Sequence, residues 1–452
     1  MDSSRVINDP LLSREERLDA LRALRKTAED RRTENGSGEI NNHIHTIYSF
    51  SPYTPAMAAL KAFEAGLEAA GSVDHDSAAA AYEMLNACAI LGIGGCAGFE
   101  MRVSFKKGAD NRPSPFAERK INNPDSAGLA YMTVQGIPKQ AVPLAAEFLA
   151  PVRDERLKRT RAMTFSANVL LKEAGVSMID FEDGVFNSSK YSEGGEITER
   201  HLLAAVSEKI ILKFGRGQDL IEGLKRKMGI TVIPKIESLL RAFENPHYLY
   251  DLLGVLKTEM LPGIFIQPDE KECIPAAAAV SFAASIGAVS SYAYLGDVGE
   301  SVTGDKKREK FEDDFIGELF NEISAFGFKA VTYMPARNTL EQLQKVQRLC
   351  GDFGFMQISG VDINSSRQSF NCKEVLRKEF RHLIDTTWAL IAHERLSGVD
   401  RRYGLFSPDS PLASLGLEKR LAAYAAFGRK LDKRDPDESA ADIALEIDKG
   451  DF

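Results

Sequence analysis

The feature that most restricts the fold of this chain is a repeated change from short apolar runs to longer helical patterns. Residues 40–45, 67–73 and 98–103 each have the length and composition of a strand, and helical patterns at residues 55–66 and 77–91 separate them. Strands that alternate with helices at this spacing are typical of parallel βα units. Further strands are predicted at residues 229–233, 288–294, 329–333 and 354–359. The sequence therefore predicts an α/β protein with a parallel sheet.

An arm precedes this body, in residues 1–38. Ser13 and Glu16 have the spacing of a helix capping box, and three leucines follow at helical spacing, at positions 18, 21 and 24. The helix is predicted to end near Thr33, before a loop that contains glycine. We therefore expect a helical arm that leads into the catalytic body.

The body is expected to span residues 39–396, with an insertion at about residues 104–198. The insertion is predicted to contain a polar loop and then a long amphipathic helix at residues 144–174. Residues 397–452 are charged and are predicted to form a helical tail on the surface.

The composition excludes some classes of protein. The 57 basic and 65 acidic residues give a net charge of −8, whereas a surface that coats nucleic acid normally has a basic excess. The five cysteines follow no metal-binding or redox spacing, the opening residues lack the apolar stretch of a signal peptide, and no run approaches the roughly 18 apolar residues of a membrane helix. We expect a cytoplasmic protein that binds neither bulk nucleic acid nor membrane, and the oligomeric state is left open.

Ligand-type residues stand at the ends of three consecutive predicted strands. His43 and His45 are two residues apart, so they point to the same face of a strand. His75 directly follows the second strand, and Glu100 follows the third. The carboxyl ends of parallel strands form one functional rim, so these side chains predict a shared metal site. Imidazole and carboxylate ligands suit zinc, manganese or iron.

The same residues carry a resemblance to a known family. The runs NNHIHTIYSFSPYTP, GLEAAGSVDHDS and GFEMRV are similar, in order and spacing, to the opening motifs of the PHP (polymerase and histidinol phosphatase) family of metal-dependent phosphoesterases. ITERHLLAAV resembles the segment that holds a family histidine at a helix start, and SGVDINSS stands where the family has a final Asp-x-His. The resemblance covers about residues 38–371. It implies a distorted (β/α)7 TIM-like barrel with an inserted segment, helical termini and a metal cluster at the strand carboxyl ends.

The resemblance also implies which residues hold metal. One ion would be held by His43, His45, Glu100 and Asp362. A second would be held by His75, a residue after the first motif and the last histidine of Asp-x-His. A third would share Glu100 and be held by His201 and a histidine from a strand that ends in His-Pro. His201 lies in the first turn of a predicted helix, where the helix dipole disfavours a protonated imidazole and keeps the ring available as a ligand.

The chain departs from the family at several of these positions. Phe50 stands where the family has Asp or His after the first motif, and Asn364 stands where it has the final histidine. The strand that should end in His-Pro reads GAVSSYAYLGDV, with Tyr292, Tyr294 and Asp297. Only the first ligand set is complete, so we expect one firm divalent ion and a second, weaker one.

Three arginines are candidates for contacts with a substrate phosphate. Arg102 shares the strand face of Glu100, and Arg367 follows the Asp362 motif. Arg337 precedes a predicted helix start, where free backbone N–H groups can accommodate a phosphate.

The preferred function is hydrolysis of a phosphate ester, in a small molecule or a nucleotide, by metal-bound hydroxide. The candidate catalytic residues are His75, Asp76 and Asn364, with Asp74 and Asp76 expected to orient His75. Two alternatives stay open. One is a catalytically weakened or inactive module that binds metal and ligand, which Phe50 and Asn364 favour. The other is hydrolysis of a C–N bond by a related barrel chemistry.

Overall fold

The computed structural model describes residues 3–28, 38–298 and 310–450. Its centre is one seven-stranded sheet in which the strands follow chain order. The strands are β1 (Ile40–Ile44), β2 (Ala69–His75), β3 (Gly94–Ser104), β4 (Leu129–Gln135), β5 (Val289–Ala293), β6 (Ala330–Tyr333) and β7 (Met356–Ser359). The end of the predicted arm, at residues 29–37, lies outside the described residues.

The sheet curves until its first and last strands meet. His45 donates its backbone N–H to the Ile363 carbonyl over 2.9 Å, and the Ile363 N–H donates to the His43 carbonyl over 3.1 Å. These bonds join β1 to the segment just after β7. The chain therefore forms a distorted TIM-like α/β barrel, which confirms the predicted fold class.

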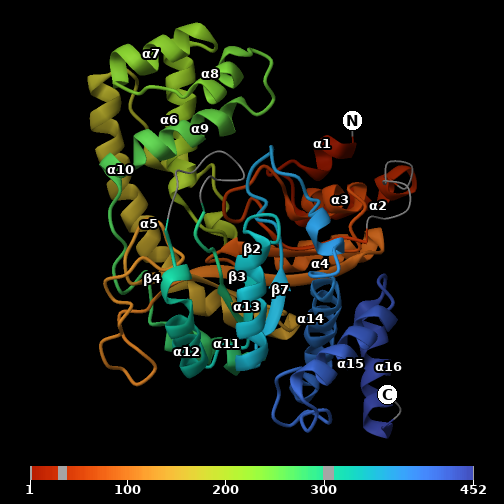
Figure 1. Ribbon diagram of the computed structural model, residues 1–452. Coiled ribbons are helices and arrows are strands. Elements are labelled where there is room, and N and C mark those ends of the chain that lie inside the picture. Colours follow the sequence, from red (N-terminus) through yellow and green to blue (C-terminus); the bar gives the residue numbers. More distant parts are fainter. Residues whose placement is uncertain (1–2, 29–37, 299–309, 451–452) are drawn as a thin grey trace.

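The helices flank the sheet, extend beyond one end of it and cover the other (Figure 1). They are α1 (Ser3–Ile7), α2 (Arg14–Ala28), α3 (Pro55–Glu64), α4 (Ala81–Leu91), α5 (Val142–Glu173), α6 (Glu199–Phe214), α7 (Gln218–Met228), α8 (Pro234–Arg241), α9 (Tyr248–Glu259), α10 (Leu261–Ile264), α11 (Ala276–Ser285), α12 (Ile316–Phe326), α13 (Leu340–Phe353), α14 (His382–Val399), α15 (Leu417–Lys430) and α16 (Pro436–Lys449). Within the described ranges, no helix is both long and apolar enough to cross a bilayer.

Strand β4 differs from the others in direction. It pairs antiparallel with both β3 and β5, whereas the remaining neighbours are parallel. β4 lies inside the predicted insertion at residues 104–198, where the sequence analysis predicted no strand. The predicted strand at residues 229–233 is wrong, because these residues form an irregular connection between α7 and α8.

The segment from α5 to α10 forms a helical insert between β4 and β5. Its helices pack around a hydrophobic cluster of their own, which runs from Met163 to Ile264. In Figure 1 this insert stands beyond the end of the barrel opposite to α15 and α16. Helix α5 has 32 residues, so it is about 48 Å long and connects the two ends of the molecule.

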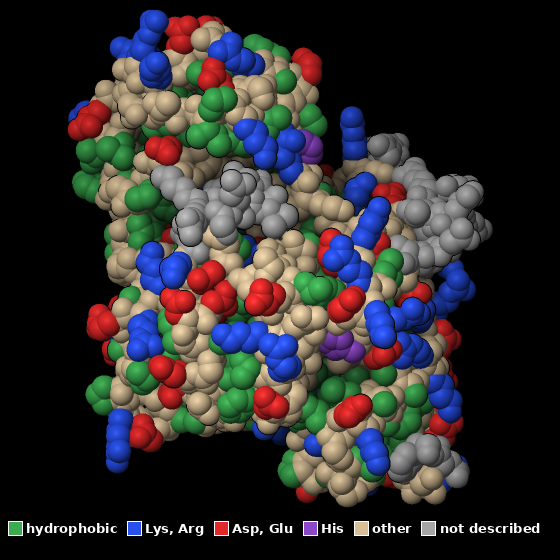
Figure 2. Space-filling model, viewed as in Figure 1, with side chains coloured by type: hydrophobic (Ala, Val, Ile, Leu, Met, Phe, Trp, Pro, Cys, Tyr) green, Lys and Arg blue, Asp and Glu red, His purple; other side chains and the backbone are tan. Residues whose placement is uncertain are grey.

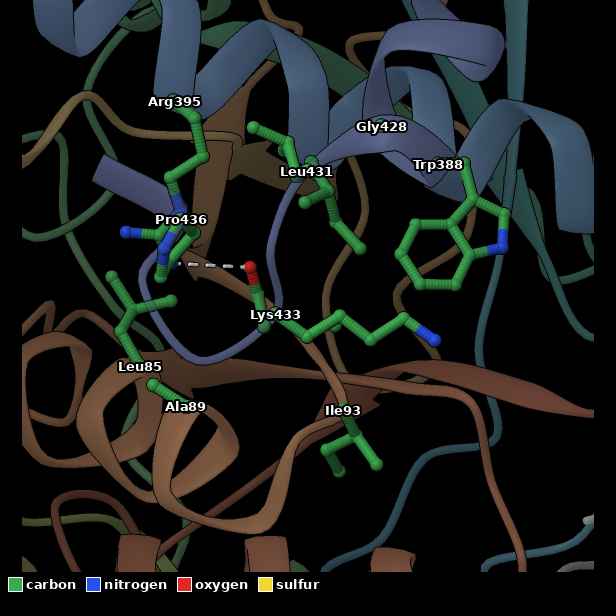
Figure 3. Close-up of a pocket in the computed structure, with 12 residues that line it drawn as sticks. Leu85, Ala89, Ile93, Trp388, Arg395, Gly428, Leu431, Lys433 and Pro436 are labelled. Atoms are coloured by element: carbon green, nitrogen blue, oxygen red, sulfur yellow. Dashed lines mark hydrogen bonds between the residues drawn. The ribbon is translucent and has the colours of Figure 1, made fainter. Parts of the chain in front are cut away.

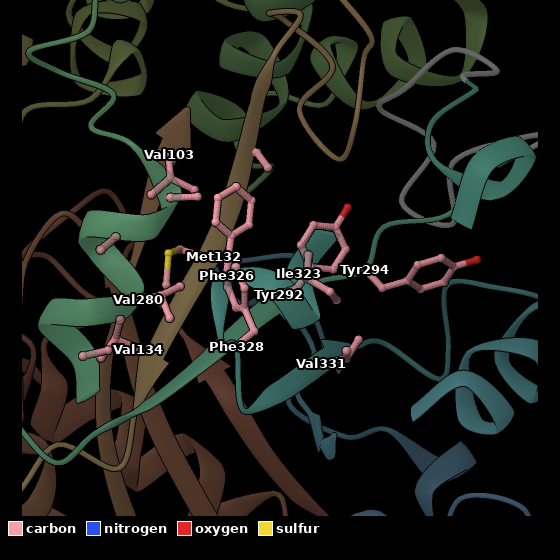
Figure 4. Packing of buried hydrophobic residues seen from close by; sticks show 14 of the residues in the cluster. Val103, Met132, Val134, Val280, Tyr292, Tyr294, Ile323, Phe326, Phe328 and Val331 are labelled. Atoms are coloured by element: carbon pink, nitrogen blue, oxygen red, sulfur yellow. The ribbon is translucent and has the colours of Figure 1, made fainter. Parts of the chain in front are cut away.

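The barrel core is apolar and closely packed. Around β3, β4, β5 and β6, side chains such as Val103, Met132 and Val331 meet Ile323 and Phe326 of α12 (Figure 4). Burying each such side chain contributes about 1.5–3 kcal/mol. The five cysteines are buried and form no disulfide.

Helix α14 covers the amino-terminal end of the barrel. Its Trp388 and Leu390 pack against the first residues of several strands, among them Ile40 of β1 and Met356 of β7. The helices of the C-terminal tail join the same cluster through residues such as Tyr424 and Ile443. The tail thus contributes to the core, whereas the sequence suggested a surface element.

The N-terminal arm is fixed by an ion pair that is buried. Arg17 of α2 donates from Nε and Nη2 to the two carboxylate oxygens of Glu83 over 2.9 and 2.6 Å, and both side chains are 1% exposed. The predicted capping box is confirmed, because the Ser13 N–H donates to the Glu16 carboxylate over 2.8 Å and the Glu16 N–H donates to the Ser13 hydroxyl over 3.3 Å.

Candidate metal centre

Strand β1 and the residues after it position two imidazoles. The Asn41 side-chain oxygen accepts from the backbone N–H groups of His43 and Val361, each over 3.0 Å. This fixes the end of β1 against the segment after β7. Gly360 belongs to that segment, and a Cβ built on it would lie 2.5 Å from the Cβ of His43. The close approach that holds His43 in place therefore requires a glycine.

The ligand-type side chains of β1, β2 and β3 converge, although Glu100 lies inside β3, which continues to Ser104, and not after it as predicted. One nitrogen of His43, one of His45 and one oxygen of Glu100 lie within 4.8 Å of one another, the single such group among the described residues. His75 Nδ1 lies 3.0 Å from Glu100 Oε2, and His45 Nε2 lies 3.3 Å from Asp362 Oδ1. The structure thus brings together five of the six predicted metal-site residues.

The donor set fits a divalent ion. His45 Nε2 is buried and has no hydrogen-bond partner among the described residues, although carboxylate oxygens of Asp362 and Glu100 lie 3.3 and 3.9 Å away. A buried polar nitrogen without a partner is costly, and nitrogen and oxygen atoms that converge in this way are typical of ligands around a cation.

The electrostatics of the group also suit ligands. Burial lowers the pKa of His43, and burial together with His45 and Arg156 lowers the pKa of His75 well below its usual value. Burial also acts to lower the pKa of His45, but Asp362 and Glu100 outweigh it and raise the pKa.

The two carboxyls differ in their pKa. Burial raises the pKa of Glu100 even though His43 and His45 oppose the change. Burial would also raise the pKa of Asp362, but the nearby His45 more than offsets this and holds the pKa below its usual range. Metal binding requires neutral imidazoles and ionised carboxylates, and the neutral rings of His43 and His75 and the charged Asp362 already meet this condition.

The two aspartates beside His75 contact groups on other segments. Asp74 accepts from the Thr46 N–H over 2.7 Å and from the hydroxyls of Thr46 and Ser49 over 2.6 and 2.7 Å. Asp76 pairs with Arg156 over 2.7 Å. Neither carboxylate hydrogen-bonds to His75 among the described contacts, and the expected orienting role stays a prediction. Asp74 holds the loop that carries His45.

His201 lies outside the converging group. Its Nδ1 accepts from the backbone N–H of Thr198 over 3.0 Å and so caps α6. Phe50 contacts the imidazole edge-on, with ring centroids 5.0 Å apart. Burial, with Arg156 and Arg200, lowers the pKa of His201 to about 3. The ring is neutral as expected, and a role as a metal ligand stays a prediction.

Asn364 lies beside the centre. Its side-chain amide donates to Asp362 Oδ1 over 2.6 Å, and its backbone carbonyl accepts from Arg200 over 3.1 Å. Asn364 therefore orients a candidate ligand, and a direct catalytic role for it stays a prediction.

The three candidate phosphate arginines all contact protein groups. Arg102 is buried and pairs with Glu272, and its Nη1 lies 3.7 Å from Glu199. Arg367 pairs with Asp251 over 2.6 Å, and Arg337 donates to the Leu295 carbonyl over 3.1 Å; contacts of the three arginines with substrate stay predictions.

The sequence analysis did not identify Arg156, which pairs with Asp76 beside His75. Arg153, Arg156 and Arg159 are three residues apart, so they share one face of α5, and this spacing was the available signal.

A separate cavity lies at the other end of the barrel (Figure 3). Trp388, Arg395 and Lys433 line it together with apolar residues of α4 and β3. Its volume is ≈ 10 Å³, room for about one water molecule. It is too small for a substrate.

No family model and no curated protein matches the chain. An amidohydrolase from Chromobacterium violaceum, solved with bound sulfate and no metal, is 18% identical, with 74% of this chain and 90% of that chain covered and a TM-score of 0.46. A proposed metal-dependent phosphoesterase from Bifidobacterium adolescentis is 15% identical, with 75% and 94% covered and a TM-score of 0.47. At these identities neither protein's activity transfers to this chain.

Proposed function

We propose that this protein is a metal-dependent hydrolase, specifically a phosphoesterase of the PHP type. One divalent ion, zinc, manganese or iron, would be held by His43, His45, Glu100 and Asp362. The observation that carries the proposal is the convergence of these side chains around the buried His45 Nε2, which has no hydrogen-bond partner among the described residues. When bound, such an ion supplies a Lewis acid that activates water and offsets charge on phosphoryl oxygens.

The chain's own residues would perform the remaining tasks. His75 contacts Glu100 and has a side chain that is 22% exposed, so it borders the solvent-facing part of the centre. Burial keeps its pKa well below the usual value, so the neutral ring is suited to donate a lone pair to a cation rather than to take up a proton. Asn364 fixes Asp362 through its amide. Asp74 holds the loop after β1 and so keeps His45 in place.

A small phosphorylated molecule is the substrate that this site suits. The side chains of His45, Glu100 and His43 are only 1%, 10% and 12% exposed, respectively. A substrate would therefore reach the centre from the side of His75 and Asp362, where the Asp362 side chain is 38% exposed. The net charge of −8 gives no basis for coating a polyanion. On the face shown in Figure 2, basic and acidic side chains are interspersed over insert and barrel.

A second candidate function is a binding module with little or no turnover. The observation that favours it is the contact of Phe50 with His201. An apolar ring occupies the place where the family resemblance implies another ligand, and the His201 Nδ1 already serves as a helix cap. The ligand sets for further ions are therefore reduced to His75 and Glu100.

Elemental analysis of the full chain, purified without chelators, tests the metal site. We expect about one ion per chain in the wild type and in a His382→Gln control, and none in His45→Ala. His382 is a suitable control because it lies outside the converging group and contacts Gln357 and Tyr333. A wild type that takes up no zinc, manganese or iron would refute the proposal.

Turnover then separates the two candidates. The loaded wild type is given a phosphomonoester, a phosphodiester and an amide with the same nitrophenyl reporter group. Release from a phosphate ester that is lost in His45→Ala supports the phosphoesterase. Bound metal without release from any ester supports the binding module.

A further inference from the structure

A buried network of ion pairs joins the helical insert to the rim of the barrel. Arg159 of α5 donates to both carboxylate oxygens of Glu272 over 2.6 and 2.8 Å and to Glu199 of α6 over 2.5 Å. Arg102 of β3 contacts the same two glutamates. The arginine side chains are at most 5% exposed, so the network is largely shielded from water.

Arg156 extends this network to the metal centre. Its Nη1 donates to Asp76 over 2.7 Å and its Nη2 donates to Glu199 over 2.8 Å. Asp76 is the residue after His75 and is 2% exposed. Arg156 is thus the described side chain of the insert that forms an ion pair with the residue next to a candidate ligand.

Asp76 has a backbone conformation that needs external support. Its φ is +47°, in the left-handed region that costs a residue with a Cβ about 1–2 kcal/mol. In this conformation its N–H donates to the Glu100 carbonyl over 2.7 Å, while the preceding His75 contacts the Glu100 carboxylate. Such strain persists only where surrounding contacts fix the residue, and the described hydrogen bond that fixes the Asp76 side chain is the one from Arg156 Nη1 to Oδ2.

We propose that Arg156 is a positioning residue that couples docking of the helical insert to metal binding. By holding Asp76 against the insert, it keeps His75 and Glu100 in the arrangement that a metal ion requires. The coupling is reciprocal, because a contact that raises metal affinity must also be strengthened when metal binds. This inference rests on the proposed metal site but assigns a role that the site residues alone do not give.

The test compares two conservative variants of the same helix, Arg156→Lys and Arg159→Lys, with the wild type. Both lose a buried guanidinium fork, since an ammonium cannot bridge two carboxylates in the same way. Of these two arginines, Arg156 is the one that pairs with Asp76 in the described structure. Zn²⁺ and Mn²⁺ affinities are measured by competition with a chromophoric chelator, and the unfolding of the metal-free proteins is measured in parallel.

We expect Arg156→Lys to weaken metal affinity about tenfold, and Arg159→Lys to leave it within about twofold while still lowering the stability of the metal-free protein. A merely structural role for Arg156 would lower stability alone. Equal affinities in wild type and Arg156→Lys, or an equal loss in both variants, would overturn the inference and leave the metal site standing. A wild type without metal binding would overturn both.

Hydrogen exchange of the wild type gives a second readout that does not depend on how a variant folds. Metal should slow amide exchange at residues 196–203, around the start of α6, about fivefold or more. Helix α16, at the opposite end of the molecule, should be unchanged. Exchange at residues 196–203 that metal does not alter would overturn the coupling.

Discussion

Glu394 lies on α14, at the covered end of the barrel, and its titration should be measurable as a change in stability. The side chain is buried, and Oε2 accepts from the Ala97 N–H over 2.7 Å. Burial raises the pKa of this carboxyl from 4.5 to about 7, although Arg395 opposes the change. The folded protein therefore keeps a proton on Glu394 at a pH where the unfolded chain has released it.

The sign of the effect follows from this difference. Between pH 4.5 and about pH 7 the unfolded state binds fewer protons, so the free energy of unfolding falls as the pH rises. At about 1.4 kcal/mol per pH unit, the loss is about 3 kcal/mol across this window. The contribution is fully present below the unfolded pKa and is lost once the folded pKa is passed. Glu394→Gln keeps an acceptor for the Ala97 N–H but cannot ionise.

Urea unfolding at half-unit steps from pH 4.5 to pH 8 measures the effect. The free energy of unfolding of Glu394→Gln should gain about 3 kcal/mol on the wild type over this range. Glu208→Gln, at an exposed position of α6, should run parallel to the wild type. Parallel profiles for wild type and Glu394→Gln would refute the reasoning, since they would mean that the carboxyl is already ionised below pH 5.

Three further changes test the anchor of the arm, the closure of the barrel and the metal centre. Arg17→Met leaves Glu83 buried without its partner and should lower the free energy of unfolding by about 3–5 kcal/mol in urea, with most of the loss recovered in Arg17→Met/Glu83→Met. A loss below about 1 kcal/mol would place this pair among those that contribute little. Gly360→Ala places a Cβ 2.5 Å from that of His43, so it should cost about 1–3 kcal/mol and weaken metal binding; wild-type metal affinity in this variant would contradict the packing argument. Metal at 100 times its Kd should stabilise the wild type by about 2.7 kcal/mol in thermal unfolding, and an equal gain in His45→Ala would place the ion elsewhere.

Strand ends were predictable because their chemistry is local. His43, His45 and His75 lie at the carboxyl ends of β1 and β2, and the rule that parallel strands share one carboxyl rim was enough to bring them together with Glu100 of β3. The antiparallel β4 was not predicted, because an antiparallel strand breaks the alternation of strands and helices on which the prediction relied. Residues 229–233 have the composition of a strand, but no neighbouring strand is available to them inside the insert.

Long-range partners explain the rest. Asp76 was expected to orient His75, yet its partner is Arg156, which is far away in the sequence and reaches the centre only because α5 returns to the rim. Likewise, His201 has the residue type of a ligand, but the capping bond to Thr198 and the ring of Phe50 determine its surroundings. Spacing along a chain shows which side chains share a face, and it does not show which element from elsewhere will cover that face.

The direction of β4 has a consequence for how the chain folds. Its partner β5 is made only after the whole helical insert, so on a chain leaving the ribosome β4 is an unpaired edge while residues 136–288 are synthesised. An open edge of this kind pairs readily with other chains. At about 5–20 residues per second the delay is much longer than the microseconds in which a hairpin such as β3–β4 forms. We expect the first four strands to wait as an incomplete half-barrel, and we expect the insert, with its own core, to fold before the barrel closes.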